Sequence, residues 1–343
     1  MTTEPPRDAT NAALPRPDNN TFFLNKPWGI LIGAGYGLLV RLLFHGEKDG
    51  IWNGLGAMSA SFALLMPFAI GAIVVYMAER QQRQSIKFYI FGPWLAVVLF
   101  LVGVLVALIE GSICIIMAAP LFLIQASIGG LIMGGICRWI NKPLRTLQTI
   151  TLLPLLLIFG ERQIALPDDI QQVTHSIYID APAPVVWQLI NFPLNIQPHE
   201  MQGGWAYMIG VPYPLEARTL DGRIGGKRHL KWQRGVSFDE HITEWQPNKK
   251  VAWTYQFHPD SFPPGSMDEH VMVGGEYFNL LDTSYTLSPE GKGTRLDVLV
   301  DYRVSTHFNW YANPLARGLI GNTAATILNF YKLRSEKTAK API

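Results

Sequence analysis

The apolar residues of this chain follow two different patterns, which divide it into a first half and a second half. In the first half they form long runs with few charges: Trp28–Phe44, Gly56–Ala78, Phe88–Ile109, Ile113–Ile136 and Leu147–Gly160. A helix needs roughly 20 apolar residues to cross the hydrocarbon core of a bilayer. The pattern therefore predicts an α-helical transmembrane bundle of about five helices, of which the fifth is the shortest, with 14 residues and Pro154.

In the second half, apolar and polar residues alternate as they do in strands that bury one face. Lys250–Phe257 and Thr294–Val304 alternate cleanly, and Gln172–Asp180 has the composition of a strand. A short amphipathic helix is predicted over Val185–Phe192, and a long helix over about Asn313–Lys337, where apolar residues recur at helical spacing. Strand, short helix, antiparallel sheet and long helix, in this order, predict an α+β domain.

Five segments follow from these patterns: a flexible N-terminal tail (1–26), a transmembrane helical region (27–160), a linker (161–171), the α+β domain (172–337) and a C-terminal tail (338–343). Basic residues lie between the second and third apolar runs and after the fourth: Arg80, Arg83, Lys87, Arg138, Lys142 and Arg145. Basic loops stay in the cytoplasm. Five crossings then place the N-terminus in the cytoplasm of a bacterial inner-membrane protein and the α+β domain in the periplasm. If the fifth run does not cross, the domain is cytoplasmic.

Charge and cysteine content narrow the classes of function. Only 16% of the 343 residues are charged, against roughly 25% in a typical globular protein. Residues 1–166 carry a net charge of +4 and residues 167–343 a net charge of −2. The basic excess therefore belongs to the transmembrane half, and no nucleic-acid partner is indicated. Cys114 and Cys137 both lie in apolar runs, so no disulfide framework is expected.

Three short segments of the second half carry a resemblance to a known superfamily. Ile179–Trp187 (IDAPAPVVW) resembles the opening of the START and polyketide-cyclase (SRPBCC) superfamily, Gly235–Trp245 (GVSFDEHITEW) fits its strand pair, and Gly293–Leu296 (GTRL) matches the turn before its last strand. The resemblance covers about 165 residues and is closest to bacterial members in which this domain follows a membrane region. It implies the helix-grip fold, an antiparallel sheet wrapped around a long C-terminal helix, with a cavity for lipids or other apolar molecules between them.

Alternation along Gly235–Glu244 places Phe238, Glu240 and Ile242 on one face of a strand. If the two apolar residues face the cavity, Glu240 does too, and a buried carboxylate needs a partner. Arg228 and His270 are the candidate partners, and the three polar residues are the candidate catalytic groups. The alternative is a structural ion pair or a carboxylate in water at the end of the sheet. The candidate ligand-binding residues are Trp205, Tyr207, Trp232, Phe238, Glu240, Ile242, Trp253, Tyr255 and Tyr285.

Two further segments have alternative interpretations. Met201–Pro214, rich in glycine, proline and aromatic residues, is either a lid over the cavity or a loop that dips into the membrane. Gly130 and Gly134 form a GxxxG face that suits close helix packing, either within the bundle or in a homo-oligomer. The scattered histidines show no metal-ligand spacing, so neither a metal nor a cofactor is expected.

Three functions remain open. The leading hypothesis is membrane-anchored binding of a lipid or another hydrophobic small molecule, for transfer or sensing and without catalysis. The second is a cyclase-like or dehydratase-like enzyme that uses Glu240 with Arg228 or a nearby histidine as acid and base. The third is a sensory or assembly module that binds a protein partner.

Overall fold

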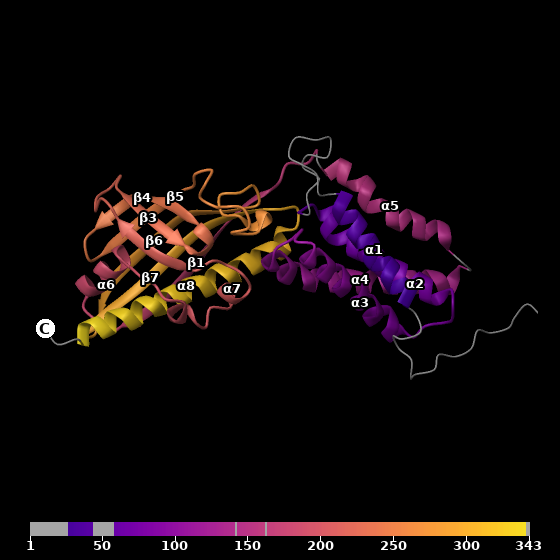
Figure 1. The fold of residues 1–343 in the computed structure, drawn as a ribbon, viewed down its shortest axis with the longest axis horizontal. Coiled ribbons are helices and arrows are strands. Elements are labelled where there is room, and N and C mark those ends of the chain that lie inside the picture. Colours follow the sequence, from indigo (N-terminus) through magenta and orange to yellow (C-terminus); the bar gives the residue numbers. More distant parts are fainter. Residues whose placement is uncertain (1–26, 44–57, 141–142, 162, 341–343) are drawn as a thin grey trace, which may run out of the picture. The chain divides into compact units, whose positions relative to one another are not determined.

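The computed structural model describes residues 27–43, 58–140, 143–161 and 163–340 (Figure 1). The chain forms two compact units. The helical unit is Met1–Ala107 with Ala118–Ile164, and the sheet unit is Leu108–Met117 with Ala165–Ile343. The expected N-terminal tail, residues 1–26, lies outside the described residues.

Helices form over all five apolar runs in the described residues: α1 (Pro27–Leu43), the π-helical turn η1 (Ser61–Leu65) with α2 (Met66–Glu79), α3 (Ile86–Val106), α4 (Ser112–Trp139) and α5 (Leu144–Glu161). Three of them are long and apolar enough to cross a membrane: Ser61–Glu79, Ile86–Val106 and Ser112–Trp139. The prediction of five such helices is therefore supported for three in this part of the chain. The apolar helices at either end are shorter, because α1 has only 17 residues and the first turn of α5 is polar.

Glycines let the helices of the helical unit approach closely. A Cβ at Gly71 would lie 1.9 Å from the carbonyl oxygen of Ala126, so α2 and α4 pack backbone to backbone. A Cβ at Gly130 would lie 2.2 Å from the carbonyl oxygen of Tyr89, and one at Gly134 would lie 2.4 Å from the Tyr89 ring. Gly130 and Gly134 thus pack against Tyr89 of α3. This is the first of the two interpretations given above, close packing within the bundle.

The sheet unit confirms the predicted antiparallel sheet followed by a long C-terminal helix. Its strands are β1 (Asp168–Ile179), β2 (Pro214–Thr219), β3 (Lys227–Trp232), β4 (Ser237–Gln246), β5 (Lys250–Gln256), β6 (Phe278–Glu290) and β7 (Gly293–Ser305). They form one antiparallel sheet in the order β1-β7-β6-β5-β4-β3-β2. Its helices are α6 (Ala183–Asn191), α7 (Trp205–Met208) and α8 (Asn309–Lys340), with the short turns η2 (Pro198–Met201), η3 (Gln233–Gly235) and η4 (Glu269–Val271).

Figure 1 shows α8 lying along one face of this sheet, an arrangement consistent with the helix-grip fold. The helix presents a buried stripe at four-residue spacing, formed by Ala316, Ile320, Ala324 and Leu328. The helix continues to Lys340, so residues 338–340, which were predicted to belong to the C-terminal tail, are helical. The sheet faces it with the apolar side of its strands, including Val251, Trp253, Tyr285, Leu287, Leu296, Val298, Val300 and Tyr302.

Candidate functional site

A buried ion pair lies within this apolar interior. Arg228 on β3 and Glu240 on β4 are direct cross-strand partners, and the Nη1 atom of Arg228 lies 2.5 Å from Oε2 of Glu240. Each residue is only 2% exposed. The Nη2 atom of Arg228 donates a second hydrogen bond, of 2.9 Å, to the carbonyl oxygen of Ile190 at the end of α6. Glu240 faces the interior, as predicted. Of its two candidate partners, Arg228 contacts it.

Aromatic side chains enclose the pair. The guanidinium carbon of Arg228 lies 4.3 Å from the ring centroid of Trp253, within the range of a cation–π contact. Tyr285 packs at 5.4 Å, centroid to centroid, against Trp253 and at 5.7 Å against Tyr331 of α8. The hydroxyl group of Tyr255, the cross-strand partner of Glu240, is hydrogen-bonded at 2.7 Å to that of Thr283. The site is therefore a packed, largely aromatic interior with a few placed polar groups.

Burial controls the ionisation of these groups. It raises the pKa of Glu240 from 4.5 to about 7, against the lowering effect of the Arg228 guanidinium. It also raises the pKa of Tyr331 to about 12, and the pKa values of Tyr207, Tyr255 and Tyr285 lie well above the usual 10. The phenols therefore remain hydrogen-bond donors at neutral pH. Glu240 can gain or release a proton there.

The buried polar atoms without a hydrogen-bond partner among the described residues include Nε of Arg228, Nε1 of Trp253 and the hydroxyl oxygen of Tyr207. An unsatisfied buried donor costs about 1–3 kcal/mol. The phenols of Tyr207 and Tyr331 are close enough to interact electrostatically, and the phenol of Tyr331 lies within hydrogen-bonding reach of the Arg228 guanidinium. Nε of Arg228 and the Tyr207 hydroxyl group therefore belong to one polar cluster inside the sheet unit.

The structure brings together most of the residues expected to bind a ligand, but not all of them. Ile242, Trp253, Tyr255 and Tyr285 lie around Glu240, and their role in ligand binding stays a prediction. Trp232 and Phe238 instead join a second aromatic cluster, which also contains Phe257 and Phe262. This cluster forms because β3 and β4 continue past the ion pair toward the turn η3, where the loop after β5 covers their inner face.

Two other expected residues lie elsewhere. Trp205 is 43% exposed on the outer side of α7. His270 lies in η4, where its Nε2 atom is 3.2 Å from Oε1 of Glu110. The candidate role of His270 as partner of Glu240 is therefore wrong in this structure. Its position depends on the long β5–β6 connection, whose course the alternation of residues does not predict.

The sequence reasoning missed Tyr331 and Thr283. Tyr331 follows the buried stripe of α8, three residues after Leu328, and this helical spacing indicates a position facing the sheet. Thr283 lies on β6 two residues before Tyr285 and therefore on the same face of the strand, and both side chains are buried. Both positions were readable from the periodicity once the two elements had been placed against each other.

One group of described residues has metal-ligand atoms within reach of one another. The ligand atoms of Glu110, Cys114 and Asp268 lie within 4.8 Å of one another. The carboxylate of Asp268 accepts a hydrogen bond of 3.4 Å from the backbone nitrogen of Cys114, near the start of α4, and Glu110 is paired with His270. These contacts have a structural role, because they join the Leu108–Met117 segment to the loop around η4.

A groove of about 350 Å³ lies at the β2 edge of the sheet and is lined by Asn195, Ile196, Gln197, Leu215, Glu216 and Lys231. Glu216 and Lys231 form an ion pair of 2.9 Å in its wall. Its lining is mixed polar and apolar and does not include the Arg228–Glu240 pair, so it is a surface feature of the sheet edge.

No family model and no curated protein matches the chain. Solved structures resemble about half of it. A START superfamily protein from Mycobacterium smegmatis is 15% identical, with 49% of this chain and 98% of that chain covered and a TM-score of 0.33. The Zhui aromatase/cyclase from Streptomyces sp. R1128 is 12% identical, with 50% and 98% covered and a TM-score of 0.31. A protein from Mesorhizobium loti is 16% identical, with 49% and 98% covered and a TM-score of 0.31. At these values the likeness carries no argument about what this chain binds.

Proposed function

We propose that this chain is a membrane-anchored protein that binds a lipid or another largely apolar small molecule between the sheet and α8. The observation that carries the proposal is the Arg228–Glu240 pair, buried among aromatic rings with Nε of Arg228 left unsatisfied. Sites for apolar molecules are mostly apolar, with a small number of polar groups that fix orientation. The interior of the sheet unit has this composition.

The polar groups favour a ligand with a hydrogen-bond acceptor at one end. Nε of Arg228 can only donate, and the Tyr207 hydroxyl group can donate or accept. A carbonyl or hydroxyl oxygen placed between them would satisfy both atoms, while the apolar remainder of the molecule would contact Trp253 and Tyr285. Such a ligand removes the cost of the two unsatisfied atoms, and this gain supplies specificity as well as affinity.

The same site supports a second candidate function, acid–base catalysis. A general acid or base works best when its pKa lies near the operating pH, and burial brings the pKa of Glu240 to about 7. A cyclase-like or dehydratase-like reaction would use Glu240 to move a proton on a ligand oriented by Arg228. Turnover that is lost in Glu240→Gln while ligand binding remains would favour this function over binding alone.

Native mass spectrometry of the full chain, purified in mild detergent, tests the binding function. We expect a co-purified apolar molecule in the wild type and its loss in the double variant Arg228→Met/Glu240→Leu, which removes both charges together. The matched control is Lys231→Met/Glu216→Leu, which removes an ion pair on the outside of the sheet and should keep the molecule. A wild-type protein that carries no molecule and binds none from a lipid extract would refute the proposal.

For the membrane topology, we infer five crossings with the sheet unit on the side opposite the basic loops. The carboxylate of Glu161, the last residue of α5, accepts hydrogen bonds from the backbone nitrogens of Ala60 (2.5 Å) and Ser61 (2.9 Å) at the start of the helix Ser61–Glu79. At the other end of that helix, Glu79 accepts a hydrogen bond from Tyr89, which accepts one from Arg138 of α4. This supports a path in which α5 runs the length of the bundle, about 27 Å for its 18 residues.

Reporter fusions test this topology. Alkaline phosphatase fused after Ile343 should be active in a bacterial host, because it folds only outside the cytoplasm, and green fluorescent protein at the same position should be dark. Fusions after Pro143, which lies between α4 and α5, should give the opposite pair of results. The same result at both positions would show that α5 does not cross.

A further inference from the structure

The short helix α7 has two different faces. Met208 and Trp205, three residues apart, are 83% and 43% exposed, whereas Ala206 is fully buried. Tyr207 points inward and packs edge-on against Tyr213. Gly203 (φ 92°) and Gly210 (φ 125°) flank the helix in backbone conformations that suit glycine. The helix is thus a single turn between two glycine joints, apolar on both sides.

The inner face of α7 reaches the candidate site. Tyr207 packs against the apolar cluster that contains Trp253, Tyr285 and Tyr331, the residues beside the Arg228–Glu240 pair. The polar anchoring of α7 on α8 is slight: the backbone nitrogen of Ala206 donates to Oδ1 of Asn322 at 3.0 Å. Displacing α7 would open the interior beside Tyr331 at the cost of this bond and of two others just after the helix, from Ser112 to the carbonyl oxygen of Ile209 and from Arg234 to that of Gly210.

The outer face of α7 adjoins the segment Leu108–Met117, which belongs to the same compact unit. The hydroxyl group of Ser112 donates a 2.6 Å hydrogen bond to the carbonyl oxygen of Ile209, directly after α7. Tyr311, near the start of α8, donates a 2.5 Å hydrogen bond to the carbonyl oxygen of Met117. This segment connects α3 to α4, two helices long enough to cross a membrane. A turn between two crossing helices lies at a bilayer surface, and α7 is bonded to that turn.

The residues around this turn have the character of a membrane interface. Leu108 is 88% exposed and Trp310 is 65% exposed, in addition to the two exposed residues of α7. The stretch from Met201 to Pro214 contains no charged residue. Tryptophan is enriched where proteins meet the headgroup region, and apolar side chains are buried at the boundary between headgroups and acyl chains. A bilayer therefore suits this surface, and its continuity with the α3–α4 turn indicates that the bilayer is the one those helices cross.

We propose that Trp205, Met208 and Trp310 insert into the bilayer interface and that α7 is the gate through which an apolar ligand passes from the bilayer to the Arg228–Glu240 site. This inference rests on the proposed function for the identity of the cargo. In this proposal α7 contacts lipid. Met201–Pro214 is then both a lid over the site and a segment that dips into the membrane.

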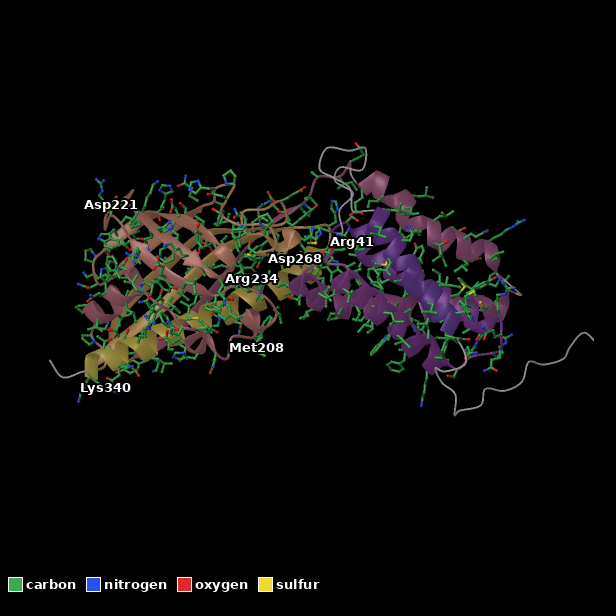
Figure 2. The ribbon with its side chains drawn as sticks, in the orientation of Figure 1. Arg41, Met208, Asp221, Arg234, Asp268 and Lys340 are labelled. Atoms are coloured by element: carbon green, nitrogen blue, oxygen red, sulfur yellow. The ribbon has the colours of Figure 1, made fainter. Side chains whose placement is uncertain are left out.

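Site-specific fluorescence tests the insertion. In the full chain with Cys114→Ala and Cys137→Ala, Met208→Cys or Trp310→Cys is labelled with an environment-sensitive fluorophore and reconstituted in vesicles of phosphatidylethanolamine and phosphatidylglycerol. The matched control is Leu220→Cys, 63% exposed in the β2–β3 turn. Figure 2 labels the neighbouring Asp221 far from Met208 within this unit. We expect blue-shifted emission and quenching by nitroxide-labelled lipids at 208 and 310, but not at 220.

Water-like emission at 208 and 310, equal to that at 220, would overturn the inference even if a ligand co-purifies. The gate is tested separately with Met208→Asp and its control Leu220→Asp. We expect Met208→Asp to slow the loading of 1-N-phenylnaphthylamine from vesicles while its binding at equilibrium in detergent is unchanged. Equal loading rates for the two variants would overturn the gate. Absence of any bound probe in the wild type, with a quenched 208 site, would instead count against the proposed function.

Discussion

The pH dependence of stability offers a direct test of the buried pair, because burial strongly opposes the ionisation of Glu240. A carboxyl group with a pKa raised in the folded state contributes stability below its unfolded pKa, and this contribution is lost as the pH rises through the folded pKa. For Glu240 the two values are 4.5 and about 7. Between pH 5 and pH 8 the wild type should therefore lose about 2–3 kcal/mol at this site.

Hydrogen exchange followed by mass spectrometry measures this effect locally, in a chain whose two units need not unfold together. The peptides that cover β3 and β4 of the full-length protein in detergent are compared at pH 5 and pH 8, after correction for the intrinsic pH dependence of exchange. We expect wild-type protection to fall toward pH 8 and this fall to disappear in Glu240→Gln. The comparison concerns the slope with pH, so a uniform loss of stability in the variant does not obscure it.

Glu216→Gln is the matched control on the neighbouring strand. The hydrogen bond from Lys231 lowers the pKa of Glu216, so its contribution is lost only as the pH falls below the usual carboxyl range, outside the window from 5 to 8. Its slope should equal that of the wild type. The reasoning is refuted if wild-type protection of β4 rises between pH 5 and pH 8 relative to Glu240→Gln. That outcome would mean that Arg228 lowers the pKa of Glu240 more than burial raises it.

Two further predictions concern packing. Glu240→Leu, which leaves Arg228 buried without a counter-charge, should cost about 3–5 kcal/mol by the same exchange measurement, and Arg228→Met/Glu240→Leu should regain most of it; a double variant no more stable than the single one would contradict this. Gly130→Ala, whose Cβ would lie 2.2 Å from the Tyr89 carbonyl oxygen, should lower the apparent melting temperature of the detergent-solubilised protein by an amount equivalent to about 1–3 kcal/mol. Gly135→Ala, with open space around its Cβ, should leave it unchanged, and equal effects of the two would contradict the packing of α4 on α3.

Alternation was sufficient to predict the inner face of β4, because the side chains of a strand alternate strictly between two environments. Phe238, Glu240 and Ile242 all face inward as predicted. The choice of Arg228 over His270 needed one more piece of information, the register of the β3–β4 hairpin. The turn η3 is centred on Arg234, six residues from each member of the pair, so the hairpin itself places Arg228 opposite Glu240.

Other features depend on long-range packing that no local pattern records. The separation of Trp232 and Phe238 from the ion pair arises because Phe257 and Phe262, both in the segment after β5, cover that part of the strands. The length of α5 was underestimated because its first turn is polar, yet helix begins at Leu144. In both cases the residue types are evident from the sequence. The positions of the elements that they pack against cannot be predicted from it.

Stability alone does not account for a charged pair in this position. Replacing a buried ion pair by apolar residues of similar volume is often neutral or stabilising, whereas loss of one partner is strongly destabilising. The surroundings of Arg228 and Glu240 are aromatic and could accommodate apolar side chains, and Nε of Arg228 is unsatisfied within them. The pair can therefore be replaced without loss of the fold, and this makes it a suitable place to test the ligand site proposed above. The double variant Arg228→Met/Glu240→Leu separates the two roles: it should fold nearly as well as the wild type and fail to retain the co-purified molecule.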